Sequence, residues 1–449
     1  MFAADDTIVA VATPAGRGGV AMARLSGPAA LDIALGLAGR TRPLTARRVT
    51  RSRLVGLAMA DDALLTYFPS PASYTGEDVV EISTHGSPVV MAAVVAAATA
   101  RGARPARPGE FTLRAFLHGK LDLLQAEAVQ ALVDAVSPAE ARVAVGQLEG
   151  GLSAAVTGVA TAIRELHLRL EASIDFPDEG YHFIDRDSAA LAVRELRARV
   201  GALVDGGARA QRLHDGHLVV VAGAPNVGKS SVFNALVGSE RAIVTPVAGT
   251  TRDLVSEHVL LGDAHLRLVD TAGVRGVADA VEQEGIRRAT AVTSDADLVL
   301  VVLDRSQPLG ADDRRVLAAT AGQVRLIVAN KSDLAPAWSE RHHGAALTVS
   351  AATGCGIEAL GERLAAHAAG GAPVDDVLVT NERQRALLRQ TLDHLQHACA
   401  AMDAAGGAMP EEFLAADLLR AGQALDELTG ARAPDDVLAE IFSRFCVGK

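Results

Sequence analysis

The sequence has 449 residues and a formal net charge of −11, and 49% of its residues are hydrophobic against 22% charged. This composition indicates a globular chain of roughly two to four domains, and the acidic balance excludes a protein that coats nucleic acid over its whole surface. The three cysteines are scattered without metal spacing, the N-terminus lacks the basic residues of a signal peptide, and no apolar run approaches the roughly 18 residues of a membrane helix. We therefore expect a cytoplasmic protein that does not enter a membrane.

Four consecutive segments differ in their residue patterns. Residues 1–119 hold short β-rich runs separated by glycine and proline, which predicts a compact α+β domain. Residues 120–214 and 379–449 carry apolar residues at helical spacing. Between them, residues 215–378 alternate apolar strands with helices, the pattern of a doubly wound sheet. We predict a multidomain chain in which this α/β domain is inserted into one helical domain.

The α/β segment opens with a phosphate-binding pattern. The apolar run HLVVVA is followed by G-x-x-x-x-G-K-S from Gly223 to Ser230, and then by a helical run. In such a loop the backbone N–H groups wrap the phosphates, the lysine (here Lys229) reaches the terminal two, and the hydroxyl of Ser230 binds magnesium. The strand before the loop and the helix after it make a nucleoside triphosphate site the strong interpretation.

The stretch LRLVDTAG predicts the residues that meet the metal and the γ-phosphate. Asp270 is placed to hold magnesium through water, and the N–H of Gly273 can meet the γ-phosphate. Many GTPases place a glutamine directly after this stretch to orient the attacking water. Here the position is Val274, which cannot hydrogen-bond water. Another group must therefore handle the water and the charge that develops in the transition state.

Two further strand ends predict a guanine site. LIVANKSD supplies Asn330, Lys331 and Asp333, and LTVSAATG supplies Ser350 and Ala351. Guanine presents two adjacent N–H donors that a carboxylate at Asp333 accepts, whereas adenine would leave that buried carboxylate unpaired, a discrimination on the order of 10⁴ or more. A backbone N–H at the second stretch can meet the guanine carbonyl oxygen. All four patterns in this order predict a GTPase domain.

The motifs GAPNVGKSS, VAGTTRD, DTAGVR and NKSD resemble those of the GTPase branch that includes TrmE, Era and Der. Within that branch the full chain is similar to the tRNA-modification GTPase family MnmE, also called TrmE. The likeness runs from ATPAGRGGVAMARLSG through TGEDVVEISTHG, RPGEFTLRAFLHGKLDLLQAEAV and IDFPDEG to the terminal FCVGK. It implies a tetrahydrofolate-binding and dimerisation domain, an α-helical bundle domain and an inserted P-loop GTPase domain.

In that family potassium replaces the arginine finger. Asn226, inside the phosphate loop, matches the family's potassium ligand, and the switch loop supplies the others, Thr245, Val247 and Thr250, mainly through backbone carbonyls. A monovalent cation beside the transferring phosphate can neutralise the same developing charge as a guanidinium. From the residues alone, Asn226 is equally well interpreted as a turn residue.

The resemblance also implies which residues act in hydrolysis. Thr251 matches the switch threonine that completes the magnesium shell with Ser230, and Lys229 serves the phosphates. Glu282 matches the glutamate that positions the attacking water through a second water, although on spacing alone Glu284 is an equal candidate. The implied GTP contacts are Asn226, Val227, Gly228, Lys229, Ser230, Ser231, Thr245, Pro246, Val247, Ala248, Gly249, Thr250, Thr251, Asp270, Thr271, Ala272, Gly273, Asn330, Lys331, Asp333, Ser350, Ala351 and Ala352.

The N-terminal domain resembles tetrahydrofolate-binding folds. Arg24, Glu81 and Lys120 match the family's folate-site positions, together with the C-terminal Lys449. The pterin ring shows the same adjacent donor pair as guanine, so a carboxylate suits it, while cations suit the carboxylates of the folate tail. Without the resemblance, Glu81 would be an exposed strand residue and Lys120 a surface lysine.

Cys446 lies four residues from the end of the sequence, at the spacing of a prenylation box. Such a box needs an aliphatic residue at its third place and rarely ends in lysine, so Gly448 and Lys449 argue against a lipid anchor. A cysteine is ordinarily an inert buried residue. The match to the family's terminal motif instead implies a candidate catalytic thiol near the folate site, and chemistry and shaping of the tail remain open alternatives.

The resemblance implies a potassium-activated GTPase that works with the FAD-dependent protein MnmG. As a homodimer within a heterotetramer, it would add an aminomethyl or carboxymethylaminomethyl group to carbon 5 of the tRNA wobble uridine. Its cofactors would be Mg²⁺, K⁺ and a 5-formyl- or methylene-tetrahydrofolate that supplies the one-carbon unit. The alternative is a GTP-dependent switch in ribosome assembly or rRNA binding, as in the Era and Der relatives. Those carry an RNA-binding module such as a KH domain with its GxxG loop, and we find none after residue 379.

Overall fold

The computed structural model describes residues 5–55, 57, 60–175, 184–239, 242–244, 256–270, 296–338, 346–368, 378–404 and 411–449, with only the backbone at 208–214 and 242–244. The chain forms two compact units. The first comprises residues 1–133, 146–201 and 386–449, and the second comprises residues 134–145 and 202–385.

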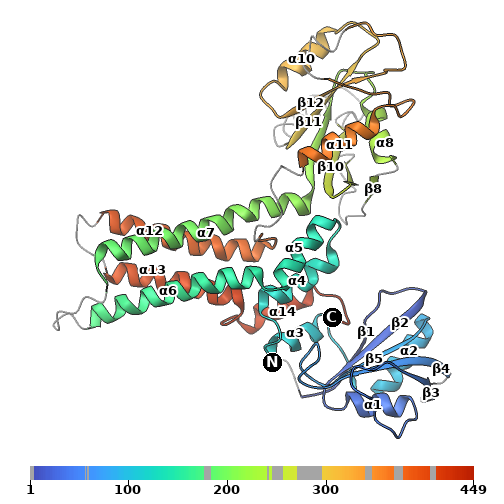
Figure 1. Ribbon diagram of the computed structural model, residues 1–449, viewed down its shortest axis with the longest axis vertical. Coiled ribbons are helices and arrows are strands. Elements are labelled where there is room, and N and C mark those ends of the chain that lie inside the picture. Colours follow the sequence, from blue (N-terminus) through green and yellow to red (C-terminus); the bar gives the residue numbers. More distant parts are fainter. Residues whose placement is uncertain are drawn as a thin grey trace, which may run out of the picture. The chain divides into compact units, whose positions relative to one another are not determined.

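The first unit begins with a six-stranded sheet in the order β3-β4-β5-β2-β1-β6 (Figure 1). All neighbours are antiparallel except β1 and β6, which are parallel. Alternate residues of the strands enter the core, as in β5, where Val80 and Ile82 are buried on the face that packs against helices. The strands are β1 (Ile8–Val11), β2 (Gly18–Ser26), β3 (Thr50–Leu54), β4 (Asp61–Phe68), β5 (Val79–Gly86) and β6 (Arg104–Pro105).

Helices α1 (Ala30–Leu37) and α2 (Pro88–Thr99) complete this α+β part. Buried residues of both helices join those of the strands in one apolar cluster, which includes Ile33, Leu37 and Val94. The predicted α+β character of the N-terminal segment is confirmed.

The remaining helices of the first unit form the helical part of the chain (Figure 1). Helix α6 buries residues at three- and four-residue spacing, including Val156, Ile163 and Leu170, and this stripe packs against α13. The helices are α3 (Glu110–Leu117), α4 (Leu123–Asp134), α6 (Gly151–Asp175), α12 (Glu382–Ala404), α13 (Glu411–Thr429) and α14 (Asp435–Ser443), with the first part of α7 (Arg186–Asp215).

The last helix returns to the N-terminal part of the chain. Leu438 and Phe442 of α14, followed by Phe445, share an apolar cluster with Leu113 of α3 and Leu123 of α4. This packing fixes the start of the terminal FCVGK segment beside residues from the beginning of the chain.

The second unit contains a seven-stranded sheet in the order β13-β12-β11-β7-β10-β9-β8. The strands from β13 to β10 are parallel, and β9 and β8 extend the sheet in antiparallel fashion. The central strands are continuous apolar runs because both faces of a parallel sheet are covered. The strands are β7 (His217–Ala222), β8 (Ala242–Val244), β9 (Ser256–Leu261), β10 (Ala264–Asp270), β11 (Leu298–Asp304), β12 (Arg325–Asn330) and β13 (Leu347–Thr348).

Within the described residues of this unit, the helices that lie with the sheet are α8 (Lys229–Val237), α10 (Ala311–Ala319) and α11 (Ile357–Ala368). The α/β architecture predicted for this part is confirmed, and with it the multidomain fold class.

One helical segment also belongs to the second unit. Glu140 of α5 (Pro138–Leu148) lies 3.6 Å from His265 Nδ1, and Arg142 forms an ion pair with Asp263 in the β9–β10 turn. These contacts give residues 134–145 their place beside the sheet. The boundaries 1–119, 120–214, 215–378 and 379–449 stay a prediction about domains.

In the part of the chain that the structure describes, no helix combines the length and the apolar character needed to span a bilayer.

Candidate functional site

The loop between β7 and α8 is shaped by backbone conformations that only certain residues adopt. Asn226 and Gly228 have φ angles of 64° and 95°, in the left-handed region that favours glycine and tolerates asparagine. A Cβ at Gly228 would lie 2.4 Å from the Asn330 side-chain nitrogen, and one at Gly223 would lie 2.5 Å from the Val302 carbonyl oxygen. Glycine is therefore required at both positions for the loop to pass so close to β11 and β12.

Two of the three predicted magnesium residues, Ser230 and Asp270, lie together beside this loop. Ser230 donates a hydrogen bond of 2.6 Å to a carboxylate oxygen of Asp270, which is buried at the end of β10. Parallel pairing of β10 with β7 places Asp270 opposite Val221, one strand from the loop. A hydroxyl and a carboxylate so placed are oxygen donors that fit a hard divalent cation.

Lys229 is buried and folds back over the loop that carries it. Its ammonium donates to the carbonyl oxygens of Gly223 and Ala224, at 3.1 and 2.8 Å. The charge is thereby held at the centre of the loop, where phosphate oxygens would gather around a bound nucleotide.

Asn330 ties two of the predicted segments together. It is buried, its amide nitrogen donates to the Val227 carbonyl at 3.0 Å, and its amide oxygen accepts from the Ala351 N–H at 3.1 Å. One side chain thus links the phosphate loop to the loop after β13, and its role is to hold both.

Lys331 makes the next link, with an acid that sequence reasoning missed. Its ammonium donates to the Asn226 carbonyl at 3.0 Å and to Asp304 at 2.6 Å. Burial raises the pKa of the Asp304 carboxyl, but hydrogen bonds from Lys331 and Ser306 outweigh burial and hold that pKa below its usual value. The signal was present in the sequence, because Asp304 ends the apolar strand LVLVVLD beside the strand that ends in Asn330.

Asp333 differs from its prediction in one respect. Ser350, which is buried, donates to the Asp333 carboxylate at 2.6 Å and so orients it, but Asp333 itself is exposed rather than buried. The prediction that a buried carboxylate reads the base therefore requires a bound base to cover Asp333.

Of the remaining predicted nucleotide residues, some lie in the described part of the chain and others do not. Val227 is buried, whereas Ser231 and Ala352 are exposed beside the loops to which they belong. The predicted residues that fall outside the described residues are Thr245, Pro246, Val247, Ala248, Gly249, Thr250, Thr251, Thr271, Ala272, Gly273, Val274, Glu282 and Glu284.

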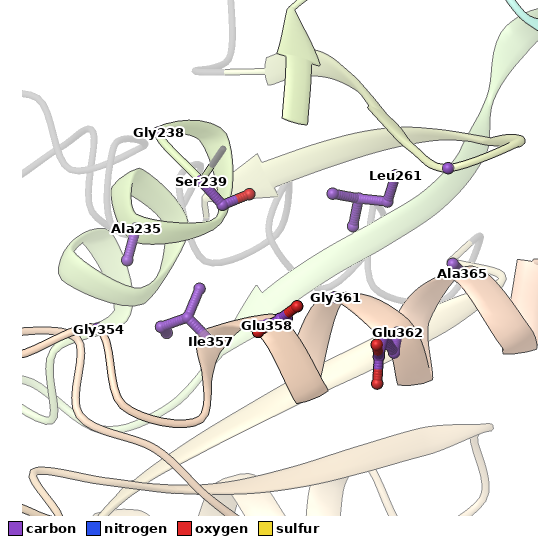
Figure 2. A pocket seen from close by; sticks show the side chains of 11 residues that line it. Ala235, Gly238, Ser239, Leu261, Gly354, Ile357, Glu358, Gly361, Glu362 and Ala365 are labelled. Carbon is purple, nitrogen blue, oxygen red and sulfur yellow. The ribbon is translucent and has the colours of Figure 1, made fainter. Parts of the chain in front are cut away.

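A cavity of about 560 Å³ lies elsewhere in the second unit, between α8, the end of β9 and α11 (Figure 2). Leu261 and Ile357 line it with small residues, and Glu358 and Glu362 of α11 border it. None of the predicted nucleotide contacts lines it, so this cavity is not the nucleotide site.

In the first unit, Arg24 and Glu81 are cross-strand partners on β2 and β5. Arg24 donates to one oxygen of Glu81 from two nitrogens, at 2.9 and 3.2 Å, and both side chains are largely buried. The guanidinium also lies near the rings of Tyr74 and Phe111, 5.5 and 5.7 Å from their centroids. Sequence reasoning missed these two aromatic residues because nothing in the local pattern distinguishes them from core residues.

The terminal segment reaches this pair. Arg24 donates to the Gly448 carbonyl at 3.4 Å, and the Gly109 N–H donates to the Cys446 carbonyl at 3.4 Å. Gly448 has a φ of 100°, and a Cβ there would lie 2.4 Å from the Val11 carbonyl oxygen. The glycine of FCVGK is therefore needed for the tail to lie against β1.

The other predicted folate residues are placed as follows. Lys120 is exposed and donates to the Pro71 carbonyl at 3.1 Å. Lys449 is half-buried at the end of the tail, and Cys446 is exposed. An exposed Cys446 is not the inert core thiol that cysteine statistics favour. Of the predicted folate residues, Arg24 and Glu81 are in direct contact, and Arg24 also contacts Gly448 of the tail. Lys120 instead donates to the loop at Pro71.

Comparison with known proteins gives the family. The profile of the MnmE helical domain matches residues 123–446, and that of the GTP-binding protein TrmE N-terminus matches residues 7–120. A tRNA modification GTPase MnmE from Azoarcus sp. (strain BH72) is 42% identical over 99% of this chain and 98% of its own length. Another MnmE, from Chloroflexus aurantiacus (strain ATCC 29366 / DSM 635 / J-10-fl), is 44% identical over 99% of this chain and 100% of its own.

Among solved structures, the G domain of the T. maritima FeoB iron transporter is 28% identical, with a TM-score of 0.27, and covers 34% of this chain and 98% of its own. The family that the motifs predicted is confirmed. Since relatives above 40% identity span nearly the whole sequence and matching profiles cover both of its ends, the chain belongs to the MnmE family of tRNA modification GTPases.

Proposed function

We propose that this protein is a potassium-activated GTP hydrolase that, with MnmG, adds an aminomethyl or carboxymethylaminomethyl group to carbon 5 of the tRNA wobble uridine. The observation that carries the GTPase half is the convergence of four separated segments on one edge of the parallel sheet. Ser230 and Asp270 meet at 2.6 Å, and Asn330 joins the phosphate loop to the loop that holds Ser350. Ligands of open α/β sheets bind at this carboxyl edge.

Each nucleotide residue then has a physical task. Lys229 and the loop N–H groups would hold the phosphates, and Ser230 with Asp270 would hold Mg²⁺, the first directly and the second through water. Magnesium supplies charge neutralisation on the phosphate oxygens when bound. Asp333, oriented by Ser350, would accept the two donors of guanine.

Potassium is proposed for the position that Asn226 borders. Asn226 is exposed on the loop with a left-handed backbone, so its side-chain oxygen is available as a neutral ligand. The backbone carbonyl of Asn226 already accepts a hydrogen bond from Lys331, so the side-chain oxygen is the atom left to bind the cation. Thr245, Val247 and Thr250 would complete the shell, Thr251 would serve Mg²⁺, and Glu282 would position the attacking water.

The folate half rests on the first unit. Arg24 holds the Glu81 carboxylate in place from two nitrogens, so that carboxylate is preorganised to accept adjacent N–H donors of a pterin. Lys120 and Lys449 would meet the carboxylates of the folate tail. Cys446 is exposed two residues before Gly448, whose carbonyl accepts from Arg24, and we assign it a role in the transfer or in shaping the tail.

The remaining proposals follow the family. We expect a cytoplasmic homodimer joined through its N-terminal domains, which assembles with MnmG into a heterotetramer and acts on tRNA. We also propose the domain division 1–119, 120–214, 215–378 and 379–449, with the third segment as the GTPase domain.

Two measurements test this function. Mass spectrometry of tRNA nucleosides from a deletion strain should show loss of the modified wobble uridine, restored by the wild-type gene. Unchanged nucleosides together with accumulating rRNA precursors would favour the alternative, a switch in ribosome assembly.

The second measurement concerns the cation. GTP turnover of the purified protein should be fast in potassium, rubidium or ammonium and slow in sodium, because Val274 cannot orient water and a cation of potassium's size is needed at Asn226. Equal rates in sodium and potassium would contradict the proposal.

A further inference from the structure

Two histidines and an aspartate gather on α12 and α13 of the first unit, helices that carry none of the predicted nucleotide or folate residues. His394 and His397 are three positions apart on α12, so their side chains share one face of that helix. Asp417 faces them from α13. One ligand atom of each residue lies within 4.8 Å of the ligand atoms of the other two.

The distances in this group are close to those of a bound metal. His394 Nδ1 lies 3.2 Å from the Asp417 carboxylate oxygen, and the two imidazole rings are 6.4 Å apart at 79°. Ligands about 2.1 Å from a tetrahedral zinc ion are about 3.4 Å from one another. The first pair already has that separation, and His397 needs only a side-chain rotation, which its exposure permits.

Buried residues anchor the two helices that carry the site. On α12 the neighbouring Leu395 and Ala398 are fully buried, and on α13 Leu414 and Leu418 are fully buried. The three polar side chains therefore stand at the rim of the packed helices, held by the core on one side and open to solvent on the other.

We propose that His394, His397 and Asp417 bind one divalent transition-metal ion, with zinc as the expected metal, which clamps α12 to α13. Two imidazoles and one carboxylate form a donor set that suits zinc, cobalt or nickel, whereas magnesium and calcium prefer oxygen ligands alone. Three protein ligands leave one coordination position for water. This site is independent of the GTP and folate proposals.

The competing explanation is an ordinary hydrogen bond between the helices. In that case His394 and Asp417 would suffice, and His397 would be a solvated side chain with no share in the interaction. The two explanations therefore differ in what His397 contributes, and this residue decides the test.

The experiment uses the full-length protein, treated with chelator and then saturated with GDP and Mg²⁺ so that the nucleotide site is filled. The exposed thiols of Cys355 and Cys446 are alkylated first, because thiolates also bind zinc. Zinc is titrated by calorimetry, and cobalt by its visible absorption.

The variants are His397→Gln, Asp417→Asn and, as the matched control, His167→Gln. His167 lies 3.4 Å from Glu171 on α6, so the control removes a histidine of a histidine–carboxylate pair that lacks a second histidine. Wild type and the control should bind one metal per chain, while His397→Gln and Asp417→Asn should bind it at least about tenfold more weakly.

His397→Gln replaces an exposed side chain, so its fold is preserved even if Asp417→Asn proves unstable. A wild-type protein that binds no zinc, or a His397→Gln variant that binds it as tightly as wild type, would overturn the proposal.

Discussion

The nucleotide site and the N-terminal site are built in different ways. The predicted nucleotide segments that the structure describes are short runs at strand ends, and the phosphate loop is shaped by local backbone conformation, as at Asn226 and Gly228. The N-terminal site instead joins residues that are far apart in the chain. Glu81 lies 57 positions from Arg24, and Gly448 lies 424 positions from it.

This difference explains what each site can tolerate. A strand-end loop is fixed by local geometry, so one added Cβ at Gly228 would disturb it directly. The N-terminal site depends on long-range packing of α14 and the tail, so it can be altered without a change in the nucleotide loops. The predictions below test whether the two sites are in fact separable.

The largest effect is expected from Asp333→Asn. Xanthine offers a carbonyl where guanine offers an amino group, so the amide should reverse the preference between GTP and xanthosine triphosphate, on the order of 10⁴ in relative kcat/KM. Steady-state turnover with both nucleotides measures this. Asp312→Asn, an exposed acid on α10, serves as the control and should leave the preference unchanged. A variant that still prefers GTP would show that Asp333 does not read the base.

The next effect is on the stability of the first unit. Arg114 is almost fully buried and pairs with Asp6, Glu77 and Glu110 at 2.5, 3.0 and 3.2 Å. Arg114→Met would remove the buried guanidinium that pairs with Glu77, while Arg104 would still pair with Asp6 and Glu110, and should destabilise the unit by roughly 3 kcal/mol.

The matched control is Arg51→Met, whose pair with Asp62 is exposed to solvent and should therefore contribute little to stability. Chemical unfolding of each variant measures the difference, while nucleotide binding reports on the second unit. An equal loss of unfolding free energy in both variants would mean that the buried ion pairs of Arg114 stabilise the unit no more than an exposed pair does.

The same comparison shows how far the sequence could lead. The phosphate loop, Asp270 and the NKSD segment were predictable because each motif lies within a few residues and encodes its own backbone geometry. Asp304 was missed although it ends a neighbouring strand, because its partner Lys331 follows the end of a different strand. The switch residues were named from the family resemblance and stay a prediction.

The ion-pair network around Arg114 could not have been predicted at all. Its members come from the first strand region, a loop and α3, and single charged residues at those places are indistinguishable from surface ones. The fold class was predictable because it follows from the periodicity of apolar residues along the chain. The contact of the tail with Arg24 joins distant residues and could be seen only in the structure.

Acid should weaken the first unit. Hydrogen bonds from Arg104 hold the pKa of the Asp6 carboxyl below its ordinary value of 3.8, despite the opposing effect of burial. For Glu110, burial raises the pKa, but the bonds from Arg104 and the Arg107 N–H outweigh it and bring the pKa below 4.5.

A carboxyl whose pKa is lowered by folding stabilises the protein above its unfolded pKa, and this stability is lost as the pH falls through the folded pKa. The first unit should therefore lose stability progressively from about pH 4.5 downward. Urea midpoints of wild type and Glu110→Gln between pH 3 and 7 measure this, and a wild-type midpoint that does not fall below pH 4 would contradict it.

The smallest effect on GTP turnover is expected from Cys446→Ser. The predicted nucleotide contacts lie between Asn226 and Ala352, and none involves the tail, so hydrolysis should stay near the wild-type rate. Replacing sulfur by oxygen keeps the shape but removes most of the nucleophilicity, so tRNA modification should fall. The exposed Cys355→Ser is the control. Normal modification by Cys446→Ser would mean that the thiol has no chemical role.

Removal of Gly448 and Lys449 tests the separation of the two sites most directly. If Lys449 meets a folate carboxylate, its loss should weaken folate binding by roughly 1.5–3 kcal/mol, the range of a charged hydrogen bond. Folate affinity and potassium-dependent GTP turnover are measured on the same purified preparation. The account predicts weaker folate binding with unchanged turnover, whereas unchanged folate affinity, or an equal loss of both, would contradict it.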